Sequence, residues 1–395
     1  MTAQIFCDRS SSRRRFSILA SVLTLACIAG GAMGQERPRI TITGDTRVGL
    51  EVRPLGGPQG AVATAILNND LDLSGWFQLG AQSAARVQGQ ANANRLFGEV
   101  LAPDGRVLFS KEYSGPPRRI AHQFADDIVQ TLVNRPGIAA STIAFIGQRS
   151  GRKEVYTSDY DGANLQQLTR DGAISVSPAL SPDGRMVAYT GYQSGFADIY
   201  LIDLANGGRR PIIRAPGTNS GAAFSPDGRS LALTMSKDGN PEIYLTSTTG
   251  GGARRLTRSP SVETSPSWAP DGRSLVITSD VSGSPQLYRL STGGGGMSRI
   301  STGHGYSSEP DVSPDGQQIA FNVRSGGTNQ VAIVGAGGGQ ARVIGAGDNP
   351  VWGANSRHLI FARGSQIILF DTFTGRSTPV VSNAGRVSEP TWSRR

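Results

Sequence analysis

Ser181-Pro182-Asp183-Gly184 is a four-residue turn that the chain repeats at a fixed interval. Its counterparts are Ser225-Pro226-Asp227-Gly228, Ala269-Pro270-Asp271-Gly272 and Ser313-Pro314-Asp315-Gly316, with glycines 44 residues apart (228 − 184, 272 − 228, 316 − 272). Pro presets φ at the second position of such a turn, and Gly supplies the left-handed conformation of a tight hairpin. A period of roughly 40–45 residues with short strands and Gly-rich turns is typical of β-propeller blades. We interpret the repeated Asp residues as turn scaffold.

The rest of the period predicts a closed ring. Each period ends on a short inner strand, and these strands recur six times, around Leu180, Phe224, Trp268, Val312, Trp352 and Trp392. The first period begins at Ile143-Ala144-Phe145 without an inner strand, and the last copy stops at Trp392 with no strands after it. The C-terminal strand therefore completes the first blade. We expect residues 139–395 to form a six-bladed β-propeller of four-stranded blades.

Residues 35–138 predict a small N-terminal α/β domain with a mobile N-terminal segment. Thr46–Val52 alternates as a strand, Gln59–Asn69 has helical propensity, and Asn94–Glu112 predicts two strands around a Pro-Asp-Gly turn. After Pro116-Pro117, apolar residues recur every four positions, as expected of one face of a helix. We expect His122, on the polar flank of that helix, to lie at the surface.

Residues 1–34 predict a signal peptide. Arg13-Arg14-Arg15 is a basic n-region, Phe16–Ile28 is apolar, and small residues precede Gln35. General secretion and the twin-arginine route both remain open. Cys7 and Cys27 are the two cysteines of the chain, so the mature part has no disulfide, thiol nucleophile or Cys metal site. The expected location is the periplasm.

Charge and hydropathy limit the partners. The net charge is +9, but the Arg residues are scattered along the periods and do not form a basic stripe, which argues against nucleic-acid binding. The apolar run of the signal peptide is too short for a membrane anchor. We expect a monomer without direct membrane insertion.

The sequence predicts no catalytic, cofactor-binding or metal-binding residue. His122, His304 and His358 are the three histidines, too few in the propeller for a triple-His metal site. No nucleophile elbow is present, and the Gly-rich runs lie between β segments instead of opening a helix. Two carboxylates that meet across the central channel are the enzymatic alternative that the sequence leaves open.

The repeated Pro-x-(Trp/Phe)-Ser-Pro-Asp-Gly, x-Ile-Tyr and x-x-Leu-Thr pattern resembles the TolB-type propeller repeat. Together with the signal, the α/β domain and the ending Glu389-Pro390-Thr391-Trp392-Ser393, residues 36–395 resemble the TolB family of the Tol–Pal envelope system. The resemblance implies a periplasmic adaptor without enzymatic activity. It implies binding of the lipoprotein Pal through one propeller face and of TolA through the mature N-terminus. Such an adaptor supports outer-membrane invagination at division and envelope integrity.

The same resemblance implies site residues. The Pal-facing loops precede the inner strands, and the matching positions are Thr218, Asn219, Thr264, Ser265, Glu309, Asn349 and Glu389. The TolA-binding segment corresponds to residues 36–44, with Glu36, Arg37, Arg39, Ile40 and Ile42. Its alternating character suits addition of a strand to a partner. The chain departs from the family pattern at Ser265, beside Thr264, where the family tends to have an acidic residue, and at Thr218, where it tends to have His.

Two alternatives stand beside the adaptor. A periplasmic glycan-binding or glycan-cleaving propeller is suggested by Trp268, Trp352 and Trp392, although their inner-strand positions predict core packing between blades. The second alternative is a scaffold that uses the repeat for an unrelated partner.

Overall fold

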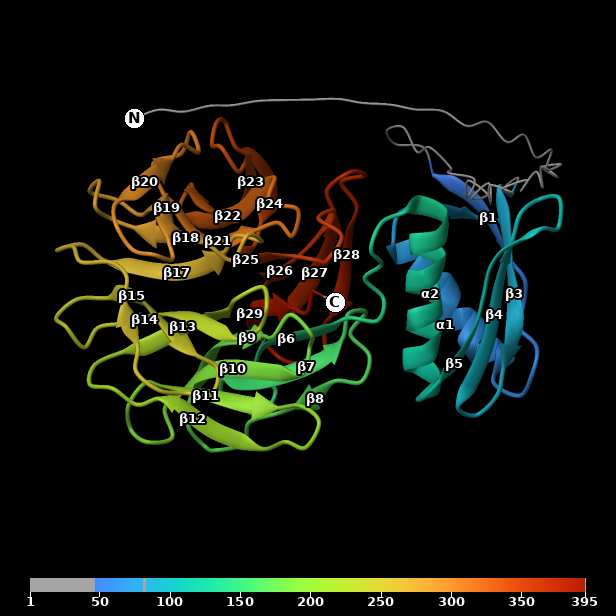
Figure 1. The fold of residues 1–395 in the computed structure, drawn as a ribbon, viewed down its shortest axis with the longest axis horizontal. Helices are drawn as coiled ribbons and strands as arrows, with labels where there is room; N and C mark the ends of the chain where they lie inside the picture. Colours follow the sequence, from blue (N-terminus) through green and yellow to red (C-terminus); the bar gives the residue numbers. More distant parts are fainter. Residues whose placement is uncertain (1–46, 81–82, 395) are drawn as a thin grey trace, which may run out of the picture. The chain divides into compact units, whose positions relative to one another are not determined.

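The computed structural model describes residues 47–80 and 83–394, which all belong to the compact unit Arg39–Arg395. One five-stranded sheet with two helices is followed along the chain by six four-stranded sheets (Figure 1). The predicted fold class, an α/β domain followed by a six-bladed propeller that the C-terminal strand closes, is confirmed. The predicted signal peptide and all five residues of the TolA-binding prediction lie outside the described residues.

The α/β part is a mixed sheet of order β2-β1-β3-β4-β5, in which β1 runs parallel to β2 and β3 and the other pairs are antiparallel. Its elements are β1 (Val48–Val52), α1 (Gly60–Leu73), β2 (Phe77–Leu79), β3 (Ala85–Ala91), β4 (Arg95–Leu101), β5 (Val107–Ser114) and α2 (Pro117–Val133). The sequence did not predict β2, which has three residues, or β3, whose Gly and Ala residues have low β propensity.

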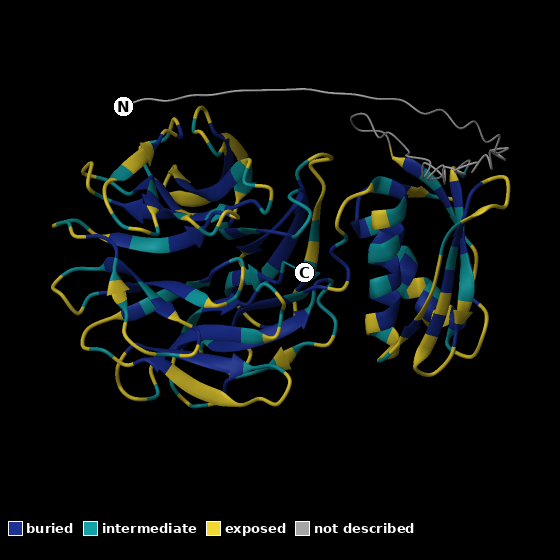
Figure 2. Ribbon diagram, viewed as in Figure 1, coloured by how far each residue is buried: buried dark blue, intermediate teal, exposed yellow. Residues whose placement is uncertain are grey.

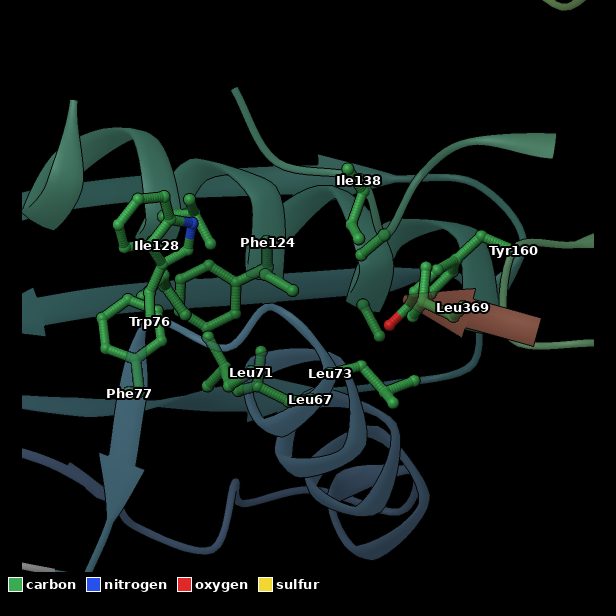
Figure 3. Packing of buried hydrophobic residues seen from close by; sticks show 14 of the residues in the cluster. Leu67, Leu71, Leu73, Trp76, Phe77, Phe124, Ile128, Ile138, Tyr160 and Leu369 are labelled. Carbon is green, nitrogen blue, oxygen red and sulfur yellow. The ribbon is translucent and has the colours of Figure 1, made fainter. Parts of the chain in front are cut away.

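Helix α2 packs through the predicted apolar stripe. Ile120, Phe124, Ile128 and Leu132 are buried, and Pro117 opens the helix at a position that needs no N–H partner. The Phe124 ring lies against Gly98 of β4, where a Cβ atom would approach it to 2.5 Å. Figure 3 shows Phe124 among the residues of this core. A glycine in mid-strand is thus explained by close packing of a ring.

The prediction that His122 lies at the surface is wrong. Its side chain is 3% exposed, and Nδ1 lies 2.7 Å from Asp70 Oδ2 of α1, while the Tyr160 hydroxyl donates to Asp70 Oδ1. Burial alone would lower the pKa of His122, but the nearby carboxylates of Asp159 and Asp70 outweigh it and raise the pKa to about 9. The apolar stripe of α2 indicates only the face toward the sheet, and the second buried face is polar.

Six blades form the propeller, and every ladder within a blade is antiparallel. From inner to outer strand, blade 1 is β29 (Val387–Trp392), β6 (Thr142–Gly147), β7 (Glu154–Asp159), β8 (Gln166–Gln167); blade 2 is β9 (Ser175–Leu180), β10 (Met186–Gly191), β11 (Asp198–Asp203), β12 (Arg209–Ile213); blade 3 is β13 (Asn219–Phe224), β14 (Ser230–Met235), β15 (Glu242–Ser247), β16 (Arg254–Arg255). Blade 4 is β17 (Glu263–Trp268), β18 (Ser274–Ser279), β19 (Gln286–Ser291), β20 (Met297–Ile300); blade 5 is β21 (Ser307–Val312), β22 (Gln318–Ser325), β23 (Thr328–Gly335), β24 (Arg342–Ala346); blade 6 is β25 (Asp348–Trp352), β26 (His358–Arg363), β27 (Gln366–Asp371), β28 (Ser377–Val381).

The C-terminal strand closes the ring as predicted. In β29, Trp392 pairs with Ile143 of β6, and its indole N–H donates to the Ser141 hydroxyl at 2.6 Å. Trp268, Trp352 and Trp392 are 6%, 0% and 2% exposed, so the tryptophans of the inner strands pack in the core. Because neighbouring blades share these cores and the last sheet joins the first, the ring presents few free edges.

The antiparallel ladders give the ring two distinct faces, because successive connections leave a sheet at opposite ends. We name the face with the Ser-Pro-Asp-Gly turns the turn face. The loop face carries the connections from each outer strand into the next inner strand, and the turns between the two middle strands. Figure 2 shows that exposed residues gather on turns and connections while the blade strands are largely buried.

Contacts of the α/β part with the propeller involve turn-face residues. Arg357, in the turn between β25 and β26, donates to the Gly75 carbonyl at 3.0 Å and pairs with the buried Asp371. Its guanidinium also lies over the Trp76 ring, 4.0 Å from the centroid. Arg118 of α2 pairs with Asp159 and with Asp161.

No helix of the described residues is long and apolar enough to span a membrane.

Candidate binding face of the propeller

Every inner strand of the propeller contains one bulge. The register shifts at the same point in all six ladders, so that two inner-strand residues oppose one residue of the next strand. The first bulge residue has a positive φ each time: Ser177 (51°), Gly221 (61°), Ser265 (52°), Glu309 (51°), Asn349 (52°) and Glu389 (53°). These positions follow the sequence period, and the bulges are therefore part of the repeat.

The sequence explains how these bulges form. Five of the six are followed by Pro, at positions 178, 266, 310, 350 and 390, which lacks the N–H that a regular ladder requires. A residue before Pro prefers an extended conformation, so a positive φ there departs from its preference. Residues other than Gly held at positive φ cost on the order of 1–3 kcal/mol each, and such strain concentrates at functional sites.

All six bulge residues line one cavity, of about 560 Å³, between the inner strands. Its wall contains residues of all six inner strands, so the cavity lies at the centre of the ring. The bulges turn side chains toward this space, as bulges commonly do beside functional sites. The walls are mixed, with Pro and Trp carbons between hydroxyl, amide and carboxylate groups.

The carboxylates in the cavity differ in their partners. Asp311 accepts hydrogen bonds from Arg394 at 2.6 Å and from the backbone N–H of Trp352 at 2.8 Å, whereas Glu389 accepts the backbone N–H of Ser177. Glu309 has no comparable cationic partner among the described residues. Glu309 is accessible to the solvent of the cavity, but the protein walls around it raise its pKa; Glu389 and Asp348 add repulsion, which the Ser265 hydroxyl opposes. Glu309 is thus a carboxylate that a donor from a partner would stabilise.

Five of the seven residues predicted for Pal binding come together in this cavity: Thr264, Ser265, Glu309, Asn349 and Glu389. Thr218 is exposed in the connection before β13, where its N–H donates to the Ser236 hydroxyl. Asn219 is buried, and its amide donates to the carbonyls of Ala197 and Ala215 at 2.8 and 2.9 Å. These bonds hold the connection in place, and the Asn219 side chain is not offered to a partner.

Two of the six bulge residues were not among the positions predicted for Pal binding. Ser177 and Gly221 line the cavity as the members of the set from blades 2 and 3. They lie 44 residues apart and precede Ser265 by the same step (221 − 177, 265 − 221). The repeat alone contained this signal, because any property of one inner strand is expected at the equivalent position of the others.

A second polar group, outside the propeller channel, has the residue types of a metal site. Ligand atoms of Asp70, His122 and Asp161 lie within 4.8 Å of one another. Each already has a protein partner: His122 and Tyr160 bond to Asp70, and Arg118 pairs with Asp161. A guanidinium inside the group disfavours a further cation, so this arrangement fits a buried hydrogen-bond network.

The geometry defines a class of protein: a six-bladed β-propeller with an N-terminal α/β domain and a strained polar ring around its axis. The family model of the TolB beta propeller domain matches residues 129–395. The chain belongs to this family.

Individual relatives agree with this membership. The Tol-Pal system protein TolB of Geobacter sulfurreducens is 37% identical over 135 residues, 32% of this chain and 31% of the relative. The Protein TolB homolog of Chlorobium luteolum is 43% identical over 107 residues, 26% of this chain and 23% of the relative. These matches thus span less than a third of each relative's length. The crystal structure of TolB from Acinetobacter baumannii is similar over 89% of this chain and 97% of that chain, with TM-score 0.78 and 26% identity.

Proposed function

We propose that this chain is a periplasmic adaptor of a Tol–Pal system, which binds Pal through the loop face and the axial cavity and TolA through residues 36–44. In this role it supports outer-membrane invagination during division and envelope integrity. The observation that carries the proposal is the ring of six bulges around one polar cavity. Strain at the same position in five of the six blades suggests selection for a shaped binding surface instead of for stability.

The cavity offers a partner hydrogen bonds of several kinds. The carboxylate of Glu309 accepts N–H groups or a cation, the hydroxyls of Thr264 and Ser265 donate or accept, and the Asn349 amide does both. A partner segment that reaches in from the loop face would neutralise Glu309. A cation or N–H donor at this position would also offset the repulsion from Glu389 and Asp348, which contributes to the raised pKa of Glu309.

The proposed role is that of an adaptor and not of an enzyme. The alternative of two catalytic carboxylates needs two free acids in the cavity, whereas Asp311 is engaged by Arg394 and Glu389 by the Ser177 N–H. The glycan alternative needs exposed aromatic faces, whereas Trp352 and Trp392 are buried in the cores between blades. Tryptophan fluorescence that changes on addition of peptidoglycan fragments would revive that alternative.

Binding of purified Pal from the same organism tests the proposal. We expect saturable binding of the mature wild-type chain, and binding at least about tenfold weaker for the double variant Glu309→Lys, Thr264→Arg, because both changes place cations and bulk in the cavity. Gln317→Lys, exposed in a turn of the turn face, is the matched control and should bind like wild type. Absence of saturable binding by the wild-type chain contradicts the proposal.

The TolA part of the proposal has its own test. A chain that begins after residue 44 should bind Pal like the mature chain but lose TolA binding in a pull-down. Equal capture of TolA by both chains would remove residues 36–44 from the proposal and leave the Pal site untouched.

A further inference from the structure

Blade 2 exposes an apolar cluster on the loop face. Phe196, in the turn between β10 and β11, is 69% exposed, the largest value among large hydrophobic residues of the described ranges. Tyr192 of the same turn is 38% exposed and Ile174, in the connection before β9, is 51% exposed. The Tyr192 N–H donates to the Ile174 carbonyl at 3.1 Å, so the turn and the connection adjoin. We name Ile174, Tyr192 and Phe196 the blade-2 patch.

The period shows what other blades place at the position of Tyr192. One step further along the chain is Ser236, whose hydroxyl accepts the Thr218 N–H at 2.8 Å; two steps further is Asp280, whose carboxylate accepts the Val262 N–H at 2.8 Å. Both side chains tie the turn to the connection that enters the inner strand of the same blade. Tyr192 replaces this side-chain tie with an exposed ring.

At the position of Phe196, too, the next two blades have a polar side chain that bonds to a connection of the loop face. The counterpart Asn240 donates to the Ser259 carbonyl at 2.9 Å, and the next counterpart, Ser284, donates to the Gly305 carbonyl at 2.8 Å. In blade 2 this polar tie is replaced by a phenyl ring in water, which gains nothing for the fold. Two aromatic departures from the repeat in one turn point to a role outside the fold.

Cations border the patch. Arg170 and Arg152 are exposed, and Arg152 donates to the carbonyl of Gly172 in the connection that leads to Ile174. The nearby acid Asp171 is neutralised by Arg209 through two hydrogen bonds. An acidic surface is the electrostatic complement of this border.

The composition of the mature chain argues against two occupants. Without the four Arg and one Asp of the predicted signal peptide, a second copy has a net charge of +6 (9 − 4 + 1), which opposes self-association. The mature N-terminal segment, residues 35–46, contains two Arg and two acidic residues, so it lacks the net negative charge that would complement the border. Ile174 directly precedes β9, and Ser177 of the same strand lines the cavity wall, so the patch and the cavity are three residues apart along the chain. A partner in the cavity therefore has the patch within reach.

We propose that the blade-2 patch is a second contact area for the partner that enters the cavity, and that it receives an apolar side chain on an acidic surface of that protein. This inference rests on the proposed function. Exposed Tyr and Phe with flanking Arg is the composition of interface hot spots, where aromatic groups fill a pocket of the partner and polar groups exclude water. The cavity and the patch then bind one protein at two sites, on and off the ring axis.

Two pairs of variants test the patch with purified Pal as the probe. Phe196→Ser combined with Tyr192→Ser should weaken Pal binding at least about tenfold at unchanged melting temperature. Val343→Ser, on the exposed outer strand β24, is the matched apolar control and should leave the affinity within about twofold. Arg170→Glu should slow association and reduce its dependence on salt, whereas Arg273→Glu on the turn face should not.

Each outcome decides the inference. If both patch variants bind Pal like wild type while the cavity variant Glu309→Lys, Thr264→Arg binds weakly, the patch is no contact area and the proposed function stands. If wild-type chain shows no saturable Pal binding, both fall. Binding to phosphatidylglycerol vesicles that depends on Phe196 would assign the patch to a membrane surface and overturn the protein partner.

Discussion

The two faces of the propeller use the same repeat in opposite ways. On the turn face, each Ser-Pro-Asp-Gly turn bonds to itself: Asp227 accepts the Arg229 N–H and the Ser225 hydroxyl, as Asp315 does in its own turn. On the loop face, equivalent positions differ from blade to blade, as Tyr192, Ser236 and Asp280 do. Uniform positions build the ring, and under the proposed function a partner is recognised through the face whose positions vary.

The largest expected effect comes from breaking the ring that both faces depend on. Trp392→Ala removes a buried indole that closes blade 1, donates to Ser141 and lies against Gly353. We expect a loss of about 3–5 kcal/mol in the free energy of unfolding. Urea denaturation measures it, with Val343→Ala as the exposed control. A loss below about 1 kcal/mol would contradict closure by the C-terminal strand.

The variant Glu309→Gln tests whether a cavity residue near the loop face serves Pal binding and not the stability of the fold. The raised pKa means that the folded chain binds this proton more tightly than the unfolded chain, so Glu309 lowers stability as the pH rises through 4.5 toward the raised value. The variant should therefore be at least as stable as wild type at pH 7, yet bind Pal several-fold more weakly.

The affinity of the wild-type chain should also fall as the pH is lowered through the raised pKa of Glu309, and that of the Glu309→Gln variant should not. Titration calorimetry at several pH values measures both. A variant that loses stability but keeps its affinity would make Glu309 a residue of the scaffold.

His122 tests the region where α2 of the α/β part contacts the turn face of the propeller; its ring lies beside Asp70 of α1 and Asp159 of the propeller. Its pKa is raised from 6.5 to about 9, so its contribution to stability is full below pH 6.5 and is lost as the pH rises through about 9. Melting temperatures of wild type should decline across this window, and His122→Gln should flatten the decline while Pal binding is unchanged. An identical decline in the variant would exclude His122 as its source.

The smallest effect is expected for Asp227→Ala on the turn face. The carboxylate accepts hydrogen bonds from the Ser225 hydroxyl and the Arg229 N–H, and both lower its pKa below the ordinary 3.8. Its contribution to the stability of the fold is therefore present above pH 3.8 and is lost as the pH falls through the lowered pKa. We expect a loss of about 1 kcal/mol or less in urea denaturation and unaltered Pal binding. Weaker Pal binding by this variant would erase the contrast between the faces.

Much of this contrast was predictable because the sequence repeats. The spacing of 44 residues specified the blades, and the missing inner strand before Ile143 specified the closure by the strand at Trp392. The cavity residues Glu309 and Glu389 were predicted from the family resemblance, which placed them in loops before the inner strands; they lie within the inner strands β21 and β29.

What the sequence did not predict depends on tertiary contacts. Asn219 and Thr218 are neighbours in the chain, but one amide is buried on carbonyls while the other side chain is exposed. The burial of His122 requires Asp70 and Tyr160, which are distant in sequence. The exposure of Phe196 becomes visible only beside the polar ties of the other blades.

Hydrogen–deuterium exchange of the mature chain, with and without Pal, tests the contrast between the two faces most directly. We predict slower exchange on Pal binding in the connections of the loop face, including residues 214–218 and 301–306, and in the turn of residues 192–197. The Ser-Pro-Asp-Gly turns should exchange at an unchanged rate. Protection of those turns with no change on the loop face would contradict the assignment of binding to the variable face.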